Sequence, residues 1–174
     1  MFIIFMDTKK LIMKYLYTIL LSAILIGCTT SNQSVIKTDD DLSAKIKLQY
    51  ENYAANDFSF SDQYSDNVVA KINNTVIDGK NNLMTGWKSH HEILYVNINI
   101  EDVYIHTNYL SNGNIWTNAW FTWKGKGQTT GLEYSNRGHF DYKWEDGKIV
   151  ELLAYFDETS ENNEIAAYTA SLEK

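Results

Sequence analysis

The feature that most constrains this chain is a series of glycine-containing turns between residues 95 and 156. They separate stretches that are rich in β-branched and aromatic residues, and they read Asn112-Gly113, Gly125-Lys126-Gly127 and Asp146-Gly147. Asn-Gly and Asp-Gly between such stretches are strong signals for two-residue hairpin turns. The spacing predicts an antiparallel meander whose strands cover residues 96–109, 115–124, 130–144 and 149–156.

Helical periodicity precedes these strands. Apolar and aromatic positions recur at spacings of three and four at Leu42, Ile46, Tyr50 and Tyr53, which describes one face of a helix. Further helices are expected over residues 80–93 and 161–172, with two short strands at 68–73 and 75–77. Helices followed by an antiparallel meander are typical of the α+β class, in which the helices cover one face of the sheet.

The first residues have the pattern of a secretory signal peptide. Lys9, Lys10 and Lys14 lie before or at the start of an apolar run whose uninterrupted part, residues 15–27, has only 13 residues. A membrane-spanning helix needs ~20 residues, so a permanent span is the weaker interpretation. Three methionines, Met1, Met6 and Met13, are possible starts.

The apolar run ends Leu25-Ile26-Gly27-Cys28, which resembles the bacterial lipobox, and Cys28 is the only cysteine. The resemblance implies that Cys28 is lipidated and anchors the chain to a membrane of the bacterial cell envelope. The alternative is an ordinary buried thiol. We therefore expect three parts: residues 1–27 as a lipoprotein signal peptide, 28–41 as a polar tether, and 42–174 as one domain.

Charge and composition exclude several classes of function. The net charge of −7 disfavours nucleic-acid binding, which needs a basic face. One cysteine excludes an internal disulfide framework and cysteine-rich zinc modules. The adjacent His90 and His91 point ~100° apart on a helix, so they do not form a shared metal site. The sequence predicts no metal and no cofactor.

The order of elements in residues 42–159 resembles the SnoaL-like branch of the NTF2-like superfamily, which also contains ketosteroid isomerases and limonene epoxide hydrolases. The resemblance rests on three features: the first helix with Tyr50 and Tyr53, the Asp78-Gly79-Lys80 entry to the second helix, and the closing segments 146–149 and 155–157. It implies an NTF2-like cone, in which a strongly curved sheet surrounds a pocket. It also implies a possible homodimer through the convex face of the sheet.

The hairpin turns predict which side chains face that pocket. A two-residue turn at Asp146-Gly147 places Phe140, Tyr142 and Trp144 on one face with Leu153, Tyr155 and Asp157. The same arithmetic at Asn112-Gly113 groups Trp116, Asn118 and Trp120 with Ile105, Thr107 and Tyr109. A β-bulge in either hairpin would invert these sets beyond it.

Asp157 is the candidate catalytic residue. Tyr155-Phe156-Asp157 matches the position that supplies a pocket aspartate in limonene epoxide hydrolases, and a comparable aspartate acts as a base in cyclase-like members. Among aromatic neighbours the carboxylate would be desolvated and its pKa raised. The alternative is that Asp157 caps the last helix. Epoxide hydrolase activity itself is not expected, because Arg137 is the only arginine and no Arg-x-Asp pair exists.

The remaining candidates are aromatic and polar side chains that we expect to bind a ligand or, alternatively, to pack in the core. They are Tyr50, Tyr53, Trp87, His91, Trp116, Asn118, Trp120, Phe140, Tyr142 and Tyr155.

The leading interpretation is an envelope-anchored lipoprotein that binds a small, partly apolar molecule. One alternative is an enzyme of the SnoaL or ketosteroid isomerase type that uses Asp157 as a base. A further alternative is a protein-interaction module without a ligand. The fold alone does not choose among them.

Overall fold

The computed structural model describes residues 33–173. The predicted signal peptide, the lipobox and Cys28 lie outside this range, so they stay predictions. Within the range, no helix is long and apolar enough to cross a membrane.

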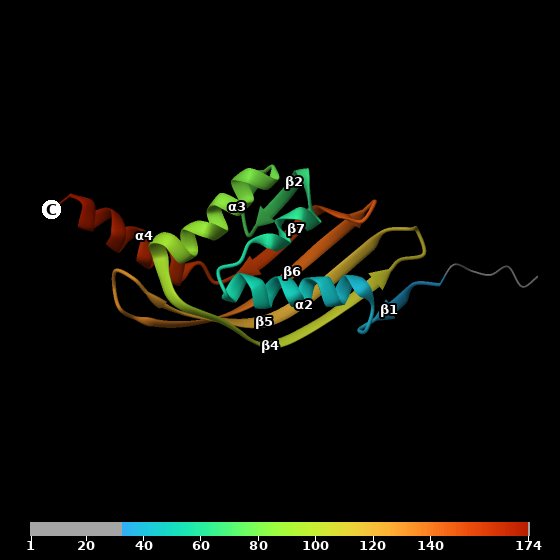
Figure 1. Ribbon diagram of the computed structural model, residues 1–174, viewed down its shortest axis with the longest axis horizontal. Helices are drawn as coiled ribbons and strands as arrows, with labels where there is room; N and C mark the ends of the chain where they lie inside the picture. The colour runs from blue at the N-terminus through green and yellow to red at the C-terminus, as the bar shows by residue number, and fades with distance from the viewer. Residues whose placement is uncertain (1–32, 174) are drawn as a thin grey trace, which may run out of the picture. The chain divides into compact units, whose positions relative to one another are not determined.

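A seven-stranded mixed sheet forms the frame of the domain, in the order β1-β4-β5-β6-β7-β2-β3 (Figure 1). Its strands are β1 (Val35–Lys37), β2 (Tyr64–Ile72), β3 (Thr75–Asp78), β4 (Tyr95–Tyr109), β5 (Ile115–Gly127), β6 (Glu133–Glu145) and β7 (Lys148–Phe156). The meander of β4 to β7 is antiparallel, as predicted. Two features were not predicted: β2 pairs in parallel with β7, and β1 forms within the expected tether and pairs with β4.

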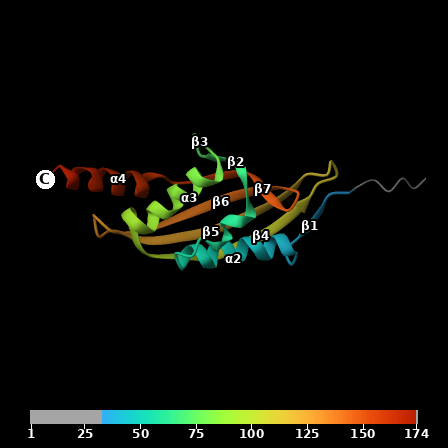
Figure 2. The same cartoon turned by 45° about the horizontal axis from the view of Figure 1, so that its top comes forward.

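Within the described residues, three α-helices and two short helical turns accompany the sheet. They are α2 (Asp41–Ala54), the 3₁₀ turn η1 (Ser59–Gln63), α3 (Lys80–Ser89), the π-turn η2 (His90–Leu94) and α4 (Thr159–Leu172). The acidic residues Asp39, Asp40 and Asp41 precede the first helical stretch, and this pattern predicts a helix N-terminus there. The Asp40 carboxylate caps α2 by accepting a 3.1 Å hydrogen bond from the Ser43 backbone N–H. The helix α2 lies along β4 and β5, α3 lies over β2, and α4 projects beyond the sheet (Figures 1 and 2).

Two β-bulges bend β4 around the helices. One extra residue of β4 is inserted between Val96 and Asn99, and another between Glu101 and Tyr104. Each bulge contains a residue with left-handed backbone, Asn97 at φ 56° and Asp102 at φ 52°. Short polar side chains tolerate this conformation best, and bulges increase the local twist and bend of a strand. The curvature produces the NTF2-like α+β cone that the sequence predicts, with its concave face toward the helices.

In both hairpins, the observed strand pairing differs by one residue from the pairing predicted for a two-residue turn. The Asp146-Gly147 turn has left-handed φ at both positions, as a two-residue turn requires. Beyond it, Trp144 pairs with Ile149 but Lys143 pairs with Glu151, so Val150 is bulged. Phe140 and Tyr142 consequently share a face with Ala154 and Leu152, and the predicted grouping with Leu153, Tyr155 and Asp157 is wrong.

The pairing in the β4–β5 hairpin differs from the predicted pairing for another reason, which is the length of its loop. Only Gly113 of the Asn-Gly pair has left-handed φ, and the Leu110 N–H donates to the Asn114 carbonyl across a longer loop. Tyr109 therefore pairs with Ile115 instead of Trp116. Trp116, Asn118 and Trp120 point to the opposite face from Thr107 and Ile105, so the predicted grouping is wrong here too.

Candidate functional site

A cavity of about 370 Å³ lies between the concave face of the sheet and the helices. This volume is within the range of small-molecule sites. Its wall is largely aromatic and aliphatic, with contributions from Tyr50, Tyr53, Phe60, Ile72, Ile77, Leu83, Trp87, Tyr95, Ile100, Phe121, Trp123, Phe140 and Phe156. The polar side chains gather mainly where η2 meets the start of α4, and they include His90, Asn136, Glu158, Ser160, Glu161 and Asn162.

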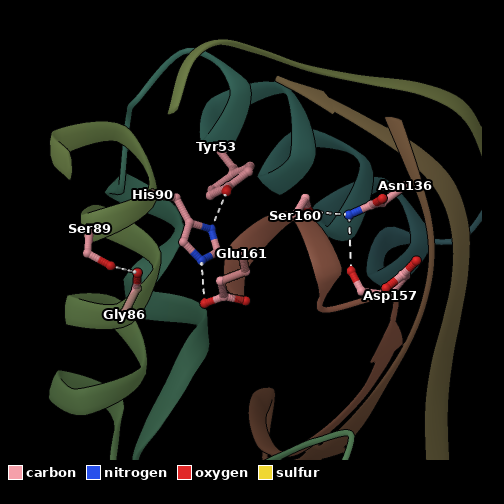
Figure 3. A network of polar contacts seen from close by, with 8 residues as sticks. All are labelled: Tyr53, Gly86, Ser89, His90, Asn136, Asp157, Ser160 and Glu161. Carbon is pink, nitrogen blue, oxygen red and sulfur yellow. Dashed lines mark hydrogen bonds and ion pairs between the residues drawn. The ribbon is translucent and has the colours of Figure 1, made fainter. Parts of the chain in front are cut away.

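A line of three side chains from three helical elements forms the polar end of the cavity (Figure 3). Tyr53 of α2 lies with its hydroxyl 2.8 Å from His90 Nδ1. On the other side of the imidazole, His90 Nε2 lies 3.6 Å from Glu161 Oε1 of α4. The imidazole thus connects a phenol and a carboxylate at one end of an otherwise apolar cavity.

Shifted pKa values describe the two outer members of these three side chains, Glu161 and Tyr53. The adjacent His90 imidazole lowers the pKa of Glu161 against the opposing effect of burial, so Glu161 is an ionised acceptor at neutral pH. Burial raises the pKa of Tyr53, so its hydroxyl keeps its proton. With the Tyr53 hydroxyl as the donor, His90 accepts at Nδ1, and its Nε2 faces Glu161.

Asn136 of β6 holds the beginning of α4 beside this end of the cavity. Its Nδ2 donates to Ser160 Oγ at 2.6 Å and to the Asp157 carbonyl at 3.1 Å (Figure 3). On the other wall, Ser89 Oγ donates to the Gly86 carbonyl at 2.6 Å. These contacts fix the backbone on both sides of His90 and Glu161.

A second carboxylate anchors α4 more deeply. Glu164 is fully buried and accepts hydrogen bonds from the Thr129 N–H at 3.1 Å, the Thr130 N–H at 3.3 Å, the Thr130 hydroxyl and the Tyr134 hydroxyl. Burial alone would raise the pKa of Glu164, but these donors lower it. Glu164 lies one helical turn after Glu161, so this anchor sets where Glu161 meets His90.

The deep end of the cavity has a buried hydrogen-bonded network. Tyr64 donates to Gln49 Oε1 at 3.1 Å, Gln49 Nε2 donates to the Tyr142 hydroxyl at 3.4 Å, and Tyr142 donates to the Tyr50 hydroxyl at 3.0 Å. Gln49 and Tyr50 also line the cavity. Burial raises the pKa of Tyr50 well above its usual value, so its hydroxyl is a neutral hydrogen-bonding group at the cavity wall.

The structure does not place Asp157 in the cavity. Its carboxylate is exposed and accepts a 2.8 Å hydrogen bond from the Thr159 backbone N–H at the start of α4. Hydrogen bonding to Thr159 lowers the pKa of Asp157, opposite to the direction expected for a desolvated base. The reason is the bulge at Val150, which turns this part of β7 over. Asp157 has the alternative role, that of a residue at the helix N-terminus.

Four of the predicted ligand-binding residues line the cavity: Tyr50, Tyr53, Trp87 and Phe140. Tyr142 lies on the same face but behind Tyr50, as part of the buried network. His91 is not in the wall and instead packs edge-on against Tyr53 at 4.9 Å and Phe58 at 5.9 Å.

The other four predicted residues lie on the outer face of the sheet, away from the helices. They are Trp116, Asn118, Trp120 and Tyr155. Tyr104, Trp120, His139 and Tyr155 are direct cross-strand neighbours there, and we call these four residues the outer aromatic row. The Trp120 ring stacks on His139 at 4.3 Å and on His106 at 5.4 Å.

Two central residues of the polar end, His90 and Glu161, were not among the predicted site residues. Trp87 lies on the helix face that lines the cavity. His90 and His91, three and four residues later, both lie close to that face, so the spacing alone does not choose between them. The π-turn that starts at His90 changes the direction in which the following side chains point. No sequence pattern predicted this turn. Glu161 lies in the predicted last helix. Its approach to η2 joins segments that are distant in sequence, and local sequence patterns do not predict such contacts.

The described residues contain no group of three or more His, Cys, Asp or Glu side chains that could hold a metal ion. The polar end of the cavity consists of one imidazole, two carboxylates, hydroxyls and amides. It is suited to bind hydrogen-bond donors and to exchange a proton with a bound molecule.

Comparison with solved structures identifies relatives of the fold. A candidate isomerase from Bacillus subtilis is 17% identical with a TM-score of 0.60, covering 71% of this chain and 91% of that chain. A candidate polyketide cyclase from Xanthomonas campestris pv. campestris is 14% identical with a TM-score of 0.59, covering 71% and 95%. An NTF2-like protein from Anabaena variabilis is 16% identical with a TM-score of 0.54, covering 67% and 86%.

No family model matches the sequence, and no curated protein matches it. At identities this low the likeness to the solved structures is a likeness of fold. Together with the curved sheet and its helices, it identifies the architecture as the NTF2-like cone.

Proposed function

We propose that the domain binds a small, partly apolar molecule in the cavity, with a polar group of that molecule at His90 and Glu161. The observation that carries this proposal is the combination of a largely aromatic wall with one concentrated polar end. Ligand sites typically combine such a wall with a few polar groups that fix orientation. The similar structures include a candidate isomerase and a candidate polyketide cyclase, which supports a small-molecule role.

A cavity-filling variant tests the proposal. Ile77 lines the cavity, whereas its neighbour Val76 on β3 is exposed. Ile77→Trp is expected to abolish the fluorescence increase of the neutral apolar probe N-phenyl-1-naphthylamine, and Val76→Trp is expected to preserve it. Both variants require an unchanged circular dichroism spectrum. Equal probe binding by both folded variants would contradict a ligand site in this cavity.

A second candidate function is proton transfer to or from the bound molecule, as an isomerase or cyclase requires. The Tyr53–His90–Glu161 line supports it, because a carboxylate oriented by an imidazole can accept and return a proton beside an apolar substrate. This candidate assigns to Glu161 and His90 the role that the sequence suggested for Asp157.

Deuterium exchange distinguishes the two assignments. Wild-type protein is expected to accelerate deuterium incorporation at the α-carbons of 2-tetralone in D₂O, measured by NMR. His90→Gln and Glu161→Gln are expected to lose this acceleration, and Asp157→Asn to retain it. Loss in Asp157→Asn alone would return the catalytic role to Asp157, and no acceleration by wild type would leave binding as the function.

The outer aromatic row supports a partner for the opposite face of the sheet. Tyr104, Trp120 and Tyr155 are 56%, 40% and 49% exposed, and aromatic side chains of this kind are enriched at interface centres. The ion pairs Lys71–Glu151, Lys124–Glu101 and Lys143–Glu145 lie around the row. Because each of these three pairs balances its own charge in a chain of net charge −7, we propose a second copy of the chain as the occupant.

Sedimentation velocity tests this association. Wild-type domain is expected to sediment as a dimer and Trp120→Ala as a monomer. Leu172→Ala serves as the control, because Leu172 is exposed near the end of α4. A monomeric wild type, or dimers of equal strength in all three proteins, would overturn the proposal.

We also propose that Cys28 is lipidated and holds the domain at a membrane of the bacterial cell envelope. The support is the placement of Leu25-Ile26-Gly27-Cys28 at the end of the apolar run. Expression of Cys28→Ala with metabolic labelling by a palmitate analogue tests it. Label in wild type and its loss in the variant are expected; unlabelled wild type would contradict lipidation.

A further inference from the structure

The charged side chains of the cavity wall all have the same sign when His90 is neutral. Glu158 and Glu161 line the polar end, and no lysine or arginine of residues 33–173 lines the cavity. Arg137, the only arginine, lies on β6 beside Thr122 of β5 and faces outward. Protonation of His90 would offset one of the two carboxylates, so the wall stays net negative in either state.

The nearby lysines are engaged away from this wall. Lys80 pairs with Asp66 at 2.5 Å, and Lys88 places its Nζ 5.6 Å from the centre of the Phe58 ring. Among the described residues no cation pairs with Glu158, and Glu161 has only the His90 contact. A carboxylate at a partly buried position without a cation is costly unless a ligand or water compensates it.

A chain of neighbouring aromatic rings extends from this end of the cavity along its wall. Tyr53 lies 6.3 Å from Trp87, His90 lies 6.0 Å from Tyr95, and Tyr95 lies 4.7 Å from Trp123, as distances between ring centres. All of these residues line the cavity. The negative faces of aromatic rings attract organic cations, and such clusters of rings are a recurring way of binding ammonium groups.

We infer that the polar group of the ligand is a cation, and that the cavity selects an amine or quaternary ammonium compound with an apolar body. The inference rests on the proposed ligand-binding function of the cavity and adds the chemical class of the ligand. Glu158 and Glu161 supply the opposite charge, and the rings of Tyr53, Trp87, Tyr95 and Trp123 surround the cationic head. An anionic ligand would meet two carboxylates and no fixed positive side chain.

Three probes of similar shape and different charge test the inference. They are phenyltrimethylammonium, its neutral counterpart tert-butylbenzene, and the anion benzenesulfonate. Trp87 and Trp123 line the cavity, so quenching of tryptophan fluorescence reports binding to the full domain. The cation is expected to bind about tenfold more tightly than the neutral probe, and the anion is expected not to bind.

Variants that remove one carboxylate test whether the preference for the cationic probe arises at Glu158 and Glu161. Glu161→Gln and Glu158→Gln are expected to reduce the cation-to-neutral ratio of affinities while leaving the neutral probe bound. Glu173→Gln removes the same charge at the far end of α4, where the side chain is exposed, and it is expected to leave the ratio unchanged.

The outcomes separate the two proposals. Equal or tighter binding of the neutral or anionic probe would overturn the inference and leave the ligand site standing. A charge preference that Glu173→Gln reduces as much as Glu161→Gln would also overturn it, because the effect would then come from overall charge. Failure of all three probes, together with failure of N-phenyl-1-naphthylamine, would overturn the ligand site itself.

Discussion

Phe121 packs so closely against Gly138 that a Cβ atom at this glycine would lie 2.5 Å from Cζ of the ring. The two residues are cross-strand partners on β5 and β6, and both line the cavity. The absence of a side chain at position 138 therefore determines where the Phe121 ring rests and how much of the cavity stays open.

Gly138→Ala is expected to push the Phe121 ring into the cavity and weaken binding of an apolar probe by about tenfold or more, at a stability cost of about 1–3 kcal/mol. Probe titration and urea unfolding measure the two effects. Gly138→Ala combined with Phe121→Leu provides a matched test, because the smaller side chain removes the collision. Persistent weak binding in the double variant would show that steric displacement of Phe121 is not the cause.

Glu164→Gln is expected to destabilise the domain by about 2–3 kcal/mol, because it removes a buried ionised acceptor that receives four hydrogen bonds. The pKa of Glu164 is lowered by folding. Its stabilising contribution is therefore present above about pH 4.5 and is lost as the pH falls through the folded-state value.

Denaturant unfolding at pH 7 and pH 4 checks this, with hydrogen exchange of the α4 amides as a local readout. The difference between wild type and variant should shrink at the lower pH. Glu173→Gln, on the exposed end of the same helix, should match wild type. Fast exchange throughout the sheet instead of α4 would contradict a local anchor.

His91 is expected to make folding stability depend on pH. Burial lowers its pKa from the usual 6.5, so the folded state favours neutral imidazole. This contribution is present above pH 6.5 and is lost as the pH falls below it through the folded-state pKa. His91→Phe retains an aromatic ring against Tyr53 and should flatten the fall in stability between pH 7.5 and pH 5.5. Parallel curves for wild type and variant, measured by urea unfolding, would refute the assignment.

Tyr142→Phe is expected to cost about 1–3 kcal/mol, because Tyr142 is fully buried and its hydroxyl joins Gln49 to Tyr50. Tyr155→Phe removes a hydroxyl from an exposed ring and should change the free energy of unfolding by less than about 0.5 kcal/mol. Thermal or urea unfolding of both variants gives the comparison. Similar losses for the two would contradict the importance of the buried network.

Local sequence signals predicted most of the elements because those signals depend on neighbours in the chain. The acidic run 39–41 predicted the start of α2, and the glycine turns predicted the strands of the meander. The parallel pairing of β2 with β7 and the addition of β1 to β4 could not be predicted, since each joins segments that are distant in sequence. A strand's own sequence does not specify which distant strand it pairs with.

The site was harder to predict than the fold because it depends on which face of its helix or strand each side chain occupies. Tyr50, Tyr53 and Trp87 lie on regular helices and were placed correctly in the cavity wall. The pattern of side chains on each face is shifted by about one residue at three places: the bulge at Val150, the longer loop after Leu110 and the π-turn at His90. Side chains alternate between faces in a strand, so such a shift exchanges inside and outside.

The bulge at Val150 has a consequence for inherited variation in this protein. Deletion of that one codon would remove the unpaired residue and leave Ile149 opposite Trp144 and Glu151 opposite Lys143, so every later side chain would keep its face. Deletion of a codon between residues 152 and 156 would instead shift the rest of β7 by one residue and exchange its two surfaces. Homologues one residue shorter at the bulge should therefore keep the same cavity wall, whereas homologues one residue shorter further along the strand should not.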